Sequence, residues 1–572
     1  MRNAECRMQN ENKRRYLYLF LYSAFCILHS ALFTDAAPAP SPVPAPPPPP
    51  PTHPPAVFSD AESFAHNLLA AVNWVTATYV RPVSRAELLQ TTLTALYDAA
   101  SLPVPRNLRR RIDQAEKEAA ALAGTEANGN FPAPLVPALA PRHNPFVNDR
   151  PVLDLVRGIR AEIGKSENLQ GENPLRICCH VMLRSLDPYS DVITPDEEHR
   201  TIGSNPERDG FGLEVPESGT GRFIIKNVLP GSPAQRAGLR AGDEIIRLRD
   251  SDGRERQLKE SLDVLNGRTP LVRPDLGILA SPQPIKVTFR RPSLSRRSGH
   301  EKKESEQTVT LDWERFRPEN VFGVSRRDDN SWNYWLDARR KIAHLRLGGL
   351  VDSTPEDLSE IISHLRQNGL RGLILDLRWC PGGALSGSYK TAELFVGEGT
   401  IATVQYRTEP ETVFRSTNED KLLDFPMVVL INGESTGGAE MIAAALQDHH
   451  RAVMVGQRTR GKGNVQKLRG FGSIGLKVTS GTILRPSGKP LHRFPDGKPT
   501  DDWGVHPDPT HEFRISPDLS RALRTAWERQ TMRPGSSAER LLLDDPLADP
   551  QRNAALEALT EAMNRKGRAK VE

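Results

Sequence analysis

The chain has 572 residues, of which 26% are charged and 38% are hydrophobic, a composition typical of a soluble globular protein. A chain of this length is too long for a single hydrophobic core, so about three domains are expected. The formal net charge of +5 is small for the length, and no basic run carries interleaved aromatic residues. Composition and charge therefore argue against a nucleic-acid-binding protein.

The first 36 residues have the pattern of an export signal. Arg2, Arg7 and Lys13–Arg15 form a positive segment, an apolar run spans 16–33, and residues 34–37 offer a small-residue cleavage site. The apolar run is longer than the roughly 7–15 residues of a usual signal peptide, so an uncleaved membrane anchor is the alternative. Both interpretations predict export to the periplasm or cell envelope, the second with a membrane tether.

A proline-rich spacer and then helices follow this segment. Residues 37–56 are almost entirely proline and alanine, cannot form a core, and are expected to be an extended polyproline spacer. Residues 57–200 are predicted to be mostly helical, from the spacing of their apolar residues. The predicted helices lie within Phe58–Leu102, Val152–Ile163 and Leu175–Leu186, with a loop at 123–148.

Three cysteines lie outside the export segment, at Cys178, Cys179 and Cys380. Two of them are adjacent, and the third is far away in the sequence. This spacing fits neither a disulfide framework nor a zinc site. We therefore expect no metal ion and no cofactor.

A strand–turn–helix–strand pattern dominates the second half of the chain. The apolar run Met427–Ile431 predicts a buried strand, the turn residues Ser435–Gly438 predict a helix start, and the helix is expected to end at Asp448. A second buried strand is expected over Ala452–Val455. The turn after it holds Lys462 between two glycines.

A similar alternation precedes this pattern. Lys341–Leu347 predicts a strand, Thr354–Asn368 an amphipathic helix, and Gly372–Leu377 a buried strand. Strand–helix–strand units of this kind predict a mixed α/β core.

These motifs resemble those of the C-terminal processing peptidases, also called tail-specific proteases. In that family a serine-rich turn opens a helix that ends in Gln-Asp, and a T-x-G-K-G-x-x-Q motif follows. The loop Arg378–Gly383 also resembles the family's D-L-R-x-N-P-G-G loop. The residues that match the first two features are Gln447, Asp448, Thr459, Gly461–Gly463 and Gln466.

The resemblance implies a multidomain α+β fold. It assigns an N-terminal helical region to residues 57–200, a PDZ domain to 201–315 and a mixed α/β core of the crotonase/Clp-protease type to 316–512. Residues 513–572 remain as a helical tail. The family's L-D-P-H-S element is similar to Leu186–Ser190 (LDPYS), which predicts a helix ended by proline and nothing catalytic.

The PDZ resemblance is carried by two long matches. Gly210–Val215 matches a carboxylate-binding loop and its following strand, and Pro230–Ile246 matches the helix, turn and strand of protease-associated PDZ domains. In this mode a peptide C-terminus binds the backbone N–H groups of the loop, and the peptide adds as a strand to the sheet edge. The resemblance makes Phe211, Gly212 and Leu213 the peptide-binding residues.

A Ser–Lys hydrolase needs a nucleophile, a base and an oxyanion hole. The resemblance makes Lys462 the base, which burial would have to deprotonate because a free lysine has a pKa near ~10.4. If both residues lie in one strand, even spacing puts Gln466 on the same face as Lys462, where it could orient the amine. The backbone N–H groups of Gly383 and Gly438 are the candidates for the oxyanion hole.

The nucleophile position is where the chain departs from the family. The family places its serine 25 residues before the lysine, and that position is Gly437 here. Ser435 and Thr436 are the nearest hydroxyls, and a reshaped turn could bring Ser435 to Lys462. The alternative is that Ser435 or Thr436 only caps the helix. Cys380, beside the oxyanion loop, is a remote third candidate.

Two functions follow. The first is an exported serine-type endopeptidase whose PDZ domain captures the C-termini of unfolded or C-terminally tagged proteins and whose core cuts them with Ser435 and Lys462. The second is a pseudoprotease that keeps the fold and binds peptides as a scaffold without cutting them. The empty position at Gly437 favours the second function, and the intact Lys462–Gln466 pair favours the first.

Overall fold

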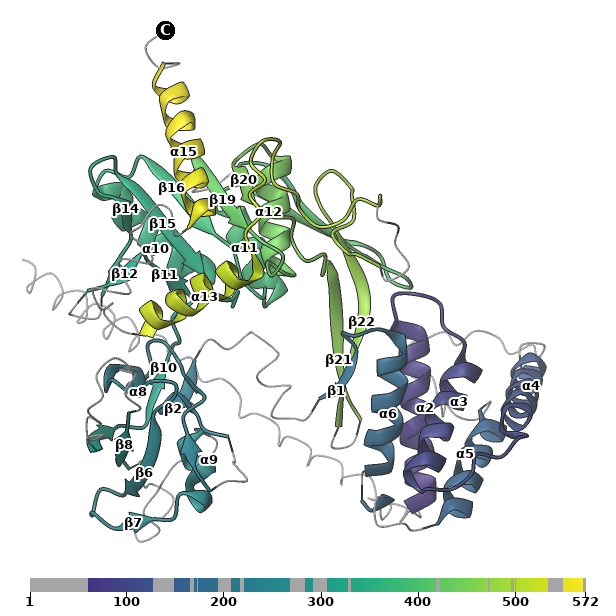
Figure 1. Ribbon diagram of the computed structural model, residues 1–572. Helices are drawn as coiled ribbons and strands as arrows, with labels where there is room; N and C mark the ends of the chain where they lie inside the picture. The colour runs from purple at the N-terminus through teal and green to yellow at the C-terminus, as the bar shows by residue number, and fades with distance from the viewer. Residues whose placement is uncertain are drawn as a thin grey trace, which may run out of the picture. The chain divides into compact units, whose positions relative to one another are not determined.

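The computed structural model describes residues 60–126, 149–164, 169–171, 173–193, 207–216, 221–267, 283–291, 306–327, 331–417, 422–471, 474–494, 498, 500–532 and 549–568. The predicted export segment, the proline-rich spacer and most of the expected 123–148 loop lie outside these residues. Within the described residues, the multidomain α+β fold expected from the sequence is confirmed (Figure 1).

Five helices lie in the described part of the N-terminal region. The helices expected before Leu102 and over 152–163 and 175–186 are confirmed, while α4 was not expected. It buries Leu108, Ile112, Ala115 and Ala119, which recur at helical spacing along an otherwise polar segment. The five helices are α2 (Asp60–Thr78), α3 (Arg85–Ala99), α4 (Leu108–Glu126), α5 (Arg150–Ile163) and α6 (Asn173–Leu186).

A long antiparallel sheet shares its core with these helices. Leu476 and Val478 of one strand pack into the helical cluster together with Phe471 of its neighbour. The helical region and the strand that follows Lys462 are therefore parts of one packed unit. The strands of this sheet are β1 (Asp191–Ile193), β17 (Gly399–Tyr406), β18 (Thr412–Ser416), β21 (Asn464–Phe471) and β22 (Ile474–Leu484).

The region expected to be a PDZ domain forms small antiparallel sheets around a cluster of its own. The segment Phe223–Val228 forms two short strands, because its first half pairs with β6 and its second half with β3. The elements are β2 (Arg208–Gly210), β3 (Leu213–Glu214), β4 (Phe223–Ile224), β5 (Asn227–Val228), α8 (Pro233–Arg236), β6 (Glu244–Arg249), β7 (Glu255–Arg256), η3 (Lys259–Ser261), α9 (Leu262–Leu265), β8 (Ile285–Arg290), β9 (Glu306–Leu311) and β10 (Glu314–Phe316).

A mixed sheet forms the centre of the core, with strands in the order β11-β15-β16-β19-β20 and β14 paired to β15. The four strands from β15 to β20 are parallel, and their predicted positions are confirmed. The strands are β11 (Val321–Phe322), β14 (Trp335–Asp337), β15 (Ile342–Leu347), β16 (Gly372–Asp376), β19 (Met427–Ile431) and β20 (Val453–Gly456), with a separate pair β12 (Ser325–Arg326) and β13 (Trp332–Asn333).

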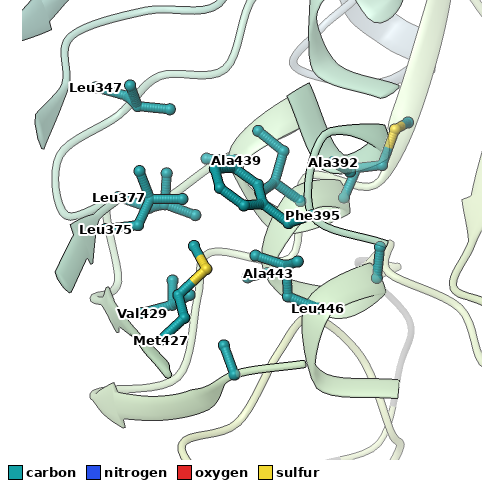
Figure 2. Packing of buried hydrophobic residues seen from close by; sticks show 14 of the residues in the cluster. Leu347, Leu375, Leu377, Ala392, Phe395, Met427, Val429, Ala439, Ala443 and Leu446 are labelled. Atoms are coloured by element: carbon teal, nitrogen blue, oxygen red, sulfur yellow. The ribbon is translucent and has the colours of Figure 1, made fainter. Parts of the chain in front are cut away.

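Helices cover both faces of this sheet. Met427, Val429 and Ile431 of β19 belong to the cluster with α10 (Thr354–Gln367), α11 (Leu385–Glu393) and α12 (Gly438–Asp448). Figure 2 shows Met427 and Val429 on the side of Ala443 and Leu446 of α12. The alternate residues Val428 and Leu430 point to the other face, as the two-residue period of a strand requires.

The C-terminal helices complete the core. Ala555 and Leu559 of α15 (Pro550–Arg568) pack on Val428 and Leu430, so this helix covers the second face (Figure 1). α13 (Pro517–Met532) contributes Trp527, whose ring lies 5.4 Å from that of Trp379 after β16. Among the described residues, no helix has the length and apolar character needed to cross a membrane.

Candidate active site

The turn between β19 and α12 is fixed by the side chain of Ser435. This side chain is fully buried; its hydroxyl donates to the Leu377 carbonyl at 2.8 Å and accepts from the Asn432 N–H at 3.0 Å. The hydroxyl therefore ties the turn to the end of β16. Neither bond reaches α12, whose N-cap residue is Gly437.

Gly437 has the backbone angles φ +59° and ψ −116°, a conformation that side chains of L-residues rarely adopt. A Cβ atom placed on Gly437 would meet nothing closer than the Lys462 carbonyl oxygen at 4.0 Å. The position predicted for the nucleophile is therefore strained for other residues but spatially open. The adjacent Gly438 is different, because a Cβ there would lie 2.0 Å from Ser388 Oγ.

The expected oxyanion loop packs against this turn. The Thr436 N–H donates to the Cys380 carbonyl at 3.0 Å, and a Cβ on Gly382 would lie 2.8 Å from Gly438 N. Gly383 follows directly, and a Cβ there would lie 1.9 Å from the Leu350 carbonyl oxygen. Gly438 is the first residue of α12, where N–H groups have no partner inside the helix. Only glycine allows these close approaches.

The thiol of Cys380 is completely buried beside the loop. Burial raises the pKa of this thiol to about 12, which keeps it protonated at neutral pH. A protonated, enclosed thiol is a poor nucleophile, so the geometry supports a packing role for Cys380.

Glu440 joins the two turns of the site, a role that the sequence pattern did not predict. Its buried carboxylate accepts from Gly437 N at 3.0 Å, from Lys462 N at 2.8 Å, and from both Gly461 N and Thr459 Oγ1 at 2.6 Å. Burial raises the pKa of Glu440 above its ordinary value, although the four hydrogen bonds act in the opposite direction. The carboxylate thus holds the turn that carries Lys462 against the turn that carries Gly437.

Lys462 is half-buried and lies close to an aromatic ring. Burial lowers the pKa of Lys462 below its ordinary value, the charges of Lys477 and Arg460 lower it further, and Glu440 opposes them. Its Nζ lies 5.5 Å from the centroid of the Tyr189 ring. A lysine with a lowered pKa in this setting suits the task of a general base.

Tyr189 belongs to the LDPYS element, in which the sequence analysis expected nothing catalytic. The Asp187 carboxylate accepts from the Tyr189 and Ser190 N–H groups, each at 2.7 Å, and shapes the turn. Ser190 Oγ accepts from Thr479 N of β22 at 3.0 Å. These bonds bring Tyr189 to Lys462, where His492 packs edge-on against its ring at 6.0 Å. The only sequence signal for this residue was the similarity of Leu186–Ser190 to the L-D-P-H-S element of the family.

The expected pairing of Gln466 with Lys462 differs in the structure. Strand β21 begins at Asn464, after the lysine, and its register shifts between Val465 and Gln466. The alternation that would place both side chains on one face is therefore broken. Gln466 Nε2 instead donates to Asn464 Oδ1 at 3.0 Å.

Asp448 has the structural position expected for it at the end of α12. Its carboxylate forms an ion pair with Arg485 at 2.5 Å and accepts from Ser487 N at 3.0 Å. Gln447 Oε1 accepts from the same arginine at 2.8 Å. The Gln-Asp pair therefore anchors the helix to the end of β22.

The expected peptide-binding loop is also built on glycine. Phe211 is fully buried, and a Cβ on Gly212 would lie 2.1 Å from Ser232 Cβ. Leu213 of β3 pairs with Val228 of β5.

Next to this loop, the side chain of Asn266 forms hydrogen bonds to both backbone groups of Val215. It accepts from Val215 N at 2.7 Å and donates to Val215 O at 3.0 Å. The backbone N–H and carbonyl of Val215, the residue after β3, are thus already hydrogen-bonded.

Among the described residues, no group of three or more His, Cys, Asp and Glu side chains is placed to hold a metal ion. The site brings together a lysine, a carboxylate clamp, backbone N–H groups and an aromatic ring.

Two family models match this chain, one over the core and one over the region expected to be a PDZ domain. Residues 341–509 match the family model described as Peptidase family S41, and residues 200–268 match the model of the PDZ domain. The solved structure of the photosystem II D1 C-terminal processing protease aligns with a TM-score of 0.38 and 18% sequence identity, over 84% of this chain and 99% of that chain.

Two curated relatives are carboxy-terminal processing proteases. The carboxy-terminal processing protease CtpA of Bacillus subtilis is 26% identical over 319 residues, which are 54% of this chain and 60% of that protein. The carboxy-terminal-processing protease of Bartonella bacilliformis is 29% identical over 316 residues, 54% of this chain and 64% of that protein. The chain thus spans less than two thirds of the length of these relatives.

Proposed function

This chain belongs to the C-terminal processing peptidase family, and from that premise we propose that it receives protein chains whose C-termini its PDZ domain captures. The partners are unfolded or C-terminally tagged proteins. The pattern of residues 1–36 supports export to the periplasm or cell envelope, with a membrane tether if the segment is not cleaved.

At the core, the protein holds a peptide without cutting it at a useful rate. The observation that carries this conclusion is the clamp of Glu440, which joins Lys462 to a turn whose nucleophile position is Gly437. On this proposal Lys462 would be the base, and residue 437, a glycine, supplies no hydroxyl. Loss of one member of such a dyad slows hydrolysis by roughly 10⁴–10⁶-fold.

A second candidate function is hydrolysis by Ser435 and Lys462. It is favoured by the lowered pKa of Lys462, which a purely binding site does not need. It requires the turn to release the Ser435 hydroxyl from Leu377 and Asn432. The buried hydrogen bonds of Ser435 make it the weaker candidate.

Binding and cleavage should be measured on the same substrate, a labelled unfolded protein with an apolar, free C-terminus. We expect saturable binding, weaker binding of the same substrate with an amidated C-terminus, and cleavage at the background rate. Cleavage that disappears in both Ser435→Ala and Lys462→Ala would support the second candidate. Failure of the substrate to bind would contradict both.

A further inference from the structure

A polar pocket lies at the carboxyl ends of β15 and β16, apart from the two turns described above. It is enclosed by the last residues of these strands, by α13 and by the start of α15. Ligands of parallel sheets commonly bind at this end of the strands. Its polar and aromatic lining residues are His344, Arg346, Arg378, Trp379, Trp527, Asp549 and Arg552.

Buried donors face this pocket without a partner among the described residues. Arg346 is 1% exposed, and its Nε and Nη1 make no hydrogen bond, while Nη2 donates to Thr531 Oγ1 at 3.3 Å. The guanidinium lies 3.7 Å from the centroid of the Trp527 ring. Trp379 Nε1 is a further buried donor without a partner. Buried donors of folded proteins are nearly always paired, so these atoms indicate a missing acceptor.

The nearby carboxylates are hydrogen-bonded to a different arginine. Asp376 and Asp549 each accept hydrogen bonds from Arg378 at 2.8–3.2 Å. Burial lowers the pKa of Arg346 well below its usual value, Asp376 opposes this shift, and the charges of Arg378 and Arg552 add to it. A buried cation without a counter-charge is strongly unfavourable.

We propose that the pocket binds one small inorganic anion, of the size of a halide ion, on Nε and Nη1 of Arg346 and Nε1 of Trp379. The space between the walls admits a body about the size of one water molecule. A water molecule would pair the donors but leave the charge of Arg346 uncompensated. A monatomic halide such as chloride is closer to this size than a polyatomic oxyanion such as phosphate.

The anion would also stabilise the loop of the candidate active site. Trp379 has φ +57°, a conformation that bulky residues rarely adopt, and its N–H donates to Asn432 Oδ1 at 3.1 Å. It directly precedes Cys380 and the glycines of the oxyanion loop. Pairing its indole N–H with an anion fixes the residue from which that loop starts.

Halide binding should be measured as thermal stability while chloride replaces gluconate at constant ionic strength, so that general screening does not change. We expect a saturable rise in melting temperature, since a ligand that binds only the folded protein stabilises it. Arg346→Met should abolish the rise. Trp379→Phe keeps a ring beside Trp527 and should weaken the apparent chloride affinity about two- to tenfold through the lost N–H.

Arg160→Met is the matched control, because Arg160 is a buried arginine already paired with Asp60 and the Leu169 carbonyl. This variant should keep the chloride response. In crystals of the wild-type protein grown with bromide, an anomalous peak should appear beside Arg346. Equal stability in chloride and gluconate, a response retained in Arg346→Met, or a bromide-free pocket would each overturn the proposal.

Discussion

The Glu440 carboxylate accepts the backbone N–H of Lys462 at 2.8 Å, and the same oxygen accepts Gly437 N at 3.0 Å. The position of the Lys462 turn relative to the Gly437 turn therefore depends on the buried carboxylate of Glu440 and not on a serine hydroxyl. Under the proposed function, this contact would keep the two turns together although residue 437 is a glycine. It also makes Glu440 the residue whose removal should do most damage to the site.

Glu440→Ala is expected to destabilise the protein by about 3 kcal/mol or more, because two buried and two half-buried donors lose their acceptor and each unpaired group costs roughly 1–3 kcal/mol. The free energy of unfolding from urea denaturation measures this. Glu434→Ala is the matched control, since Glu434 lies in the same turn but forms only an exposed ion pair with Arg524. A similar, small effect of both variants would refute the clamp.

The pH dependence of a restored enzyme should report the lowered pKa of Lys462. In Gly437→Ser the base must be neutral, so the rate should rise with pH, with a midpoint below 10.5, the ordinary value for lysine. Lys477→Gln should move the midpoint upward, because the charge of Lys477 contributes to the lowering.

Lys467→Gln is the control for this pH profile. Lys467 lies in β21, beside the strand β22 that carries Lys477, and it forms an ion pair with Glu409. It is not among the charges that shift the pKa of Lys462. Its variant should leave the midpoint in place. A rate that falls with pH, or a midpoint at or above the ordinary value, would contradict the assignment of Lys462 as the base.

Peptide binding to the PDZ domain should compete with Asn266. The Asn266 amide pairs both backbone groups of Val215, which a peptide strand added beside β3 would need. Asn266→Ala is expected to tighten binding of a peptide with a free apolar C-terminus about three- to tenfold in fluorescence anisotropy, since two competing hydrogen bonds are removed.

Two further variants serve as controls for this measurement, one expected to abolish peptide binding and one expected to leave it unchanged. Gly212→Ala should abolish peptide binding, because its methyl group would collide with Ser232. Arg254→Ala, in an exposed turn of the same domain, should change nothing. Unchanged or weaker binding by Asn266→Ala would show that the Val215 edge is not the peptide site.

The last helix is expected to be essential for folding. Ala555 of α15 is fully buried against the central sheet, so Ala555→Asp would bury an unpaired charge and cost about 3–5 kcal/mol. Loss of soluble protein, or a matching fall in unfolding free energy, would confirm this. Glu557→Ala, an exposed position on the same helix, should be tolerated. Full tolerance of the aspartate would mean that α15 does not cover the sheet in solution.

The spacing of apolar residues predicted the helices and strands that a short stretch of sequence specifies by itself. The strand Met427–Ile431 and the helix ending at Asp448 were correct because apolar runs and turn residues specify them directly. α4 was missed because only four apolar residues mark its buried side. The tail was expected to be helical, but its packing on Val428 and Leu430 depends on contacts across the sequence.

The site itself could be predicted only in part for the same reason. The lysine turn and the glycine loops are short motifs, so the resemblance found them. The role of Glu440 depends on two turns meeting, and that of Tyr189 on a bond between Ser190 and β22. For Ser435 the sequence left nucleophile and helix cap open, and its hydroxyl is bonded instead to Leu377 and Asn432.

The most direct test restores the missing hydroxyl and compares hydrolysis of one unfolded substrate by the wild-type protein, Gly437→Ser, Gly437→Ala and Gly438→Ser. The space at residue 437 accepts a Cβ, at a strain of about 1–3 kcal/mol, whereas the space at 438 does not. The account predicts background hydrolysis by the wild-type protein and a gain of at least ~10³-fold in Gly437→Ser alone, within the range that a nucleophile contributes. Wild-type hydrolysis that Gly437→Ser does not increase, and that Ser435→Ala abolishes, would contradict it.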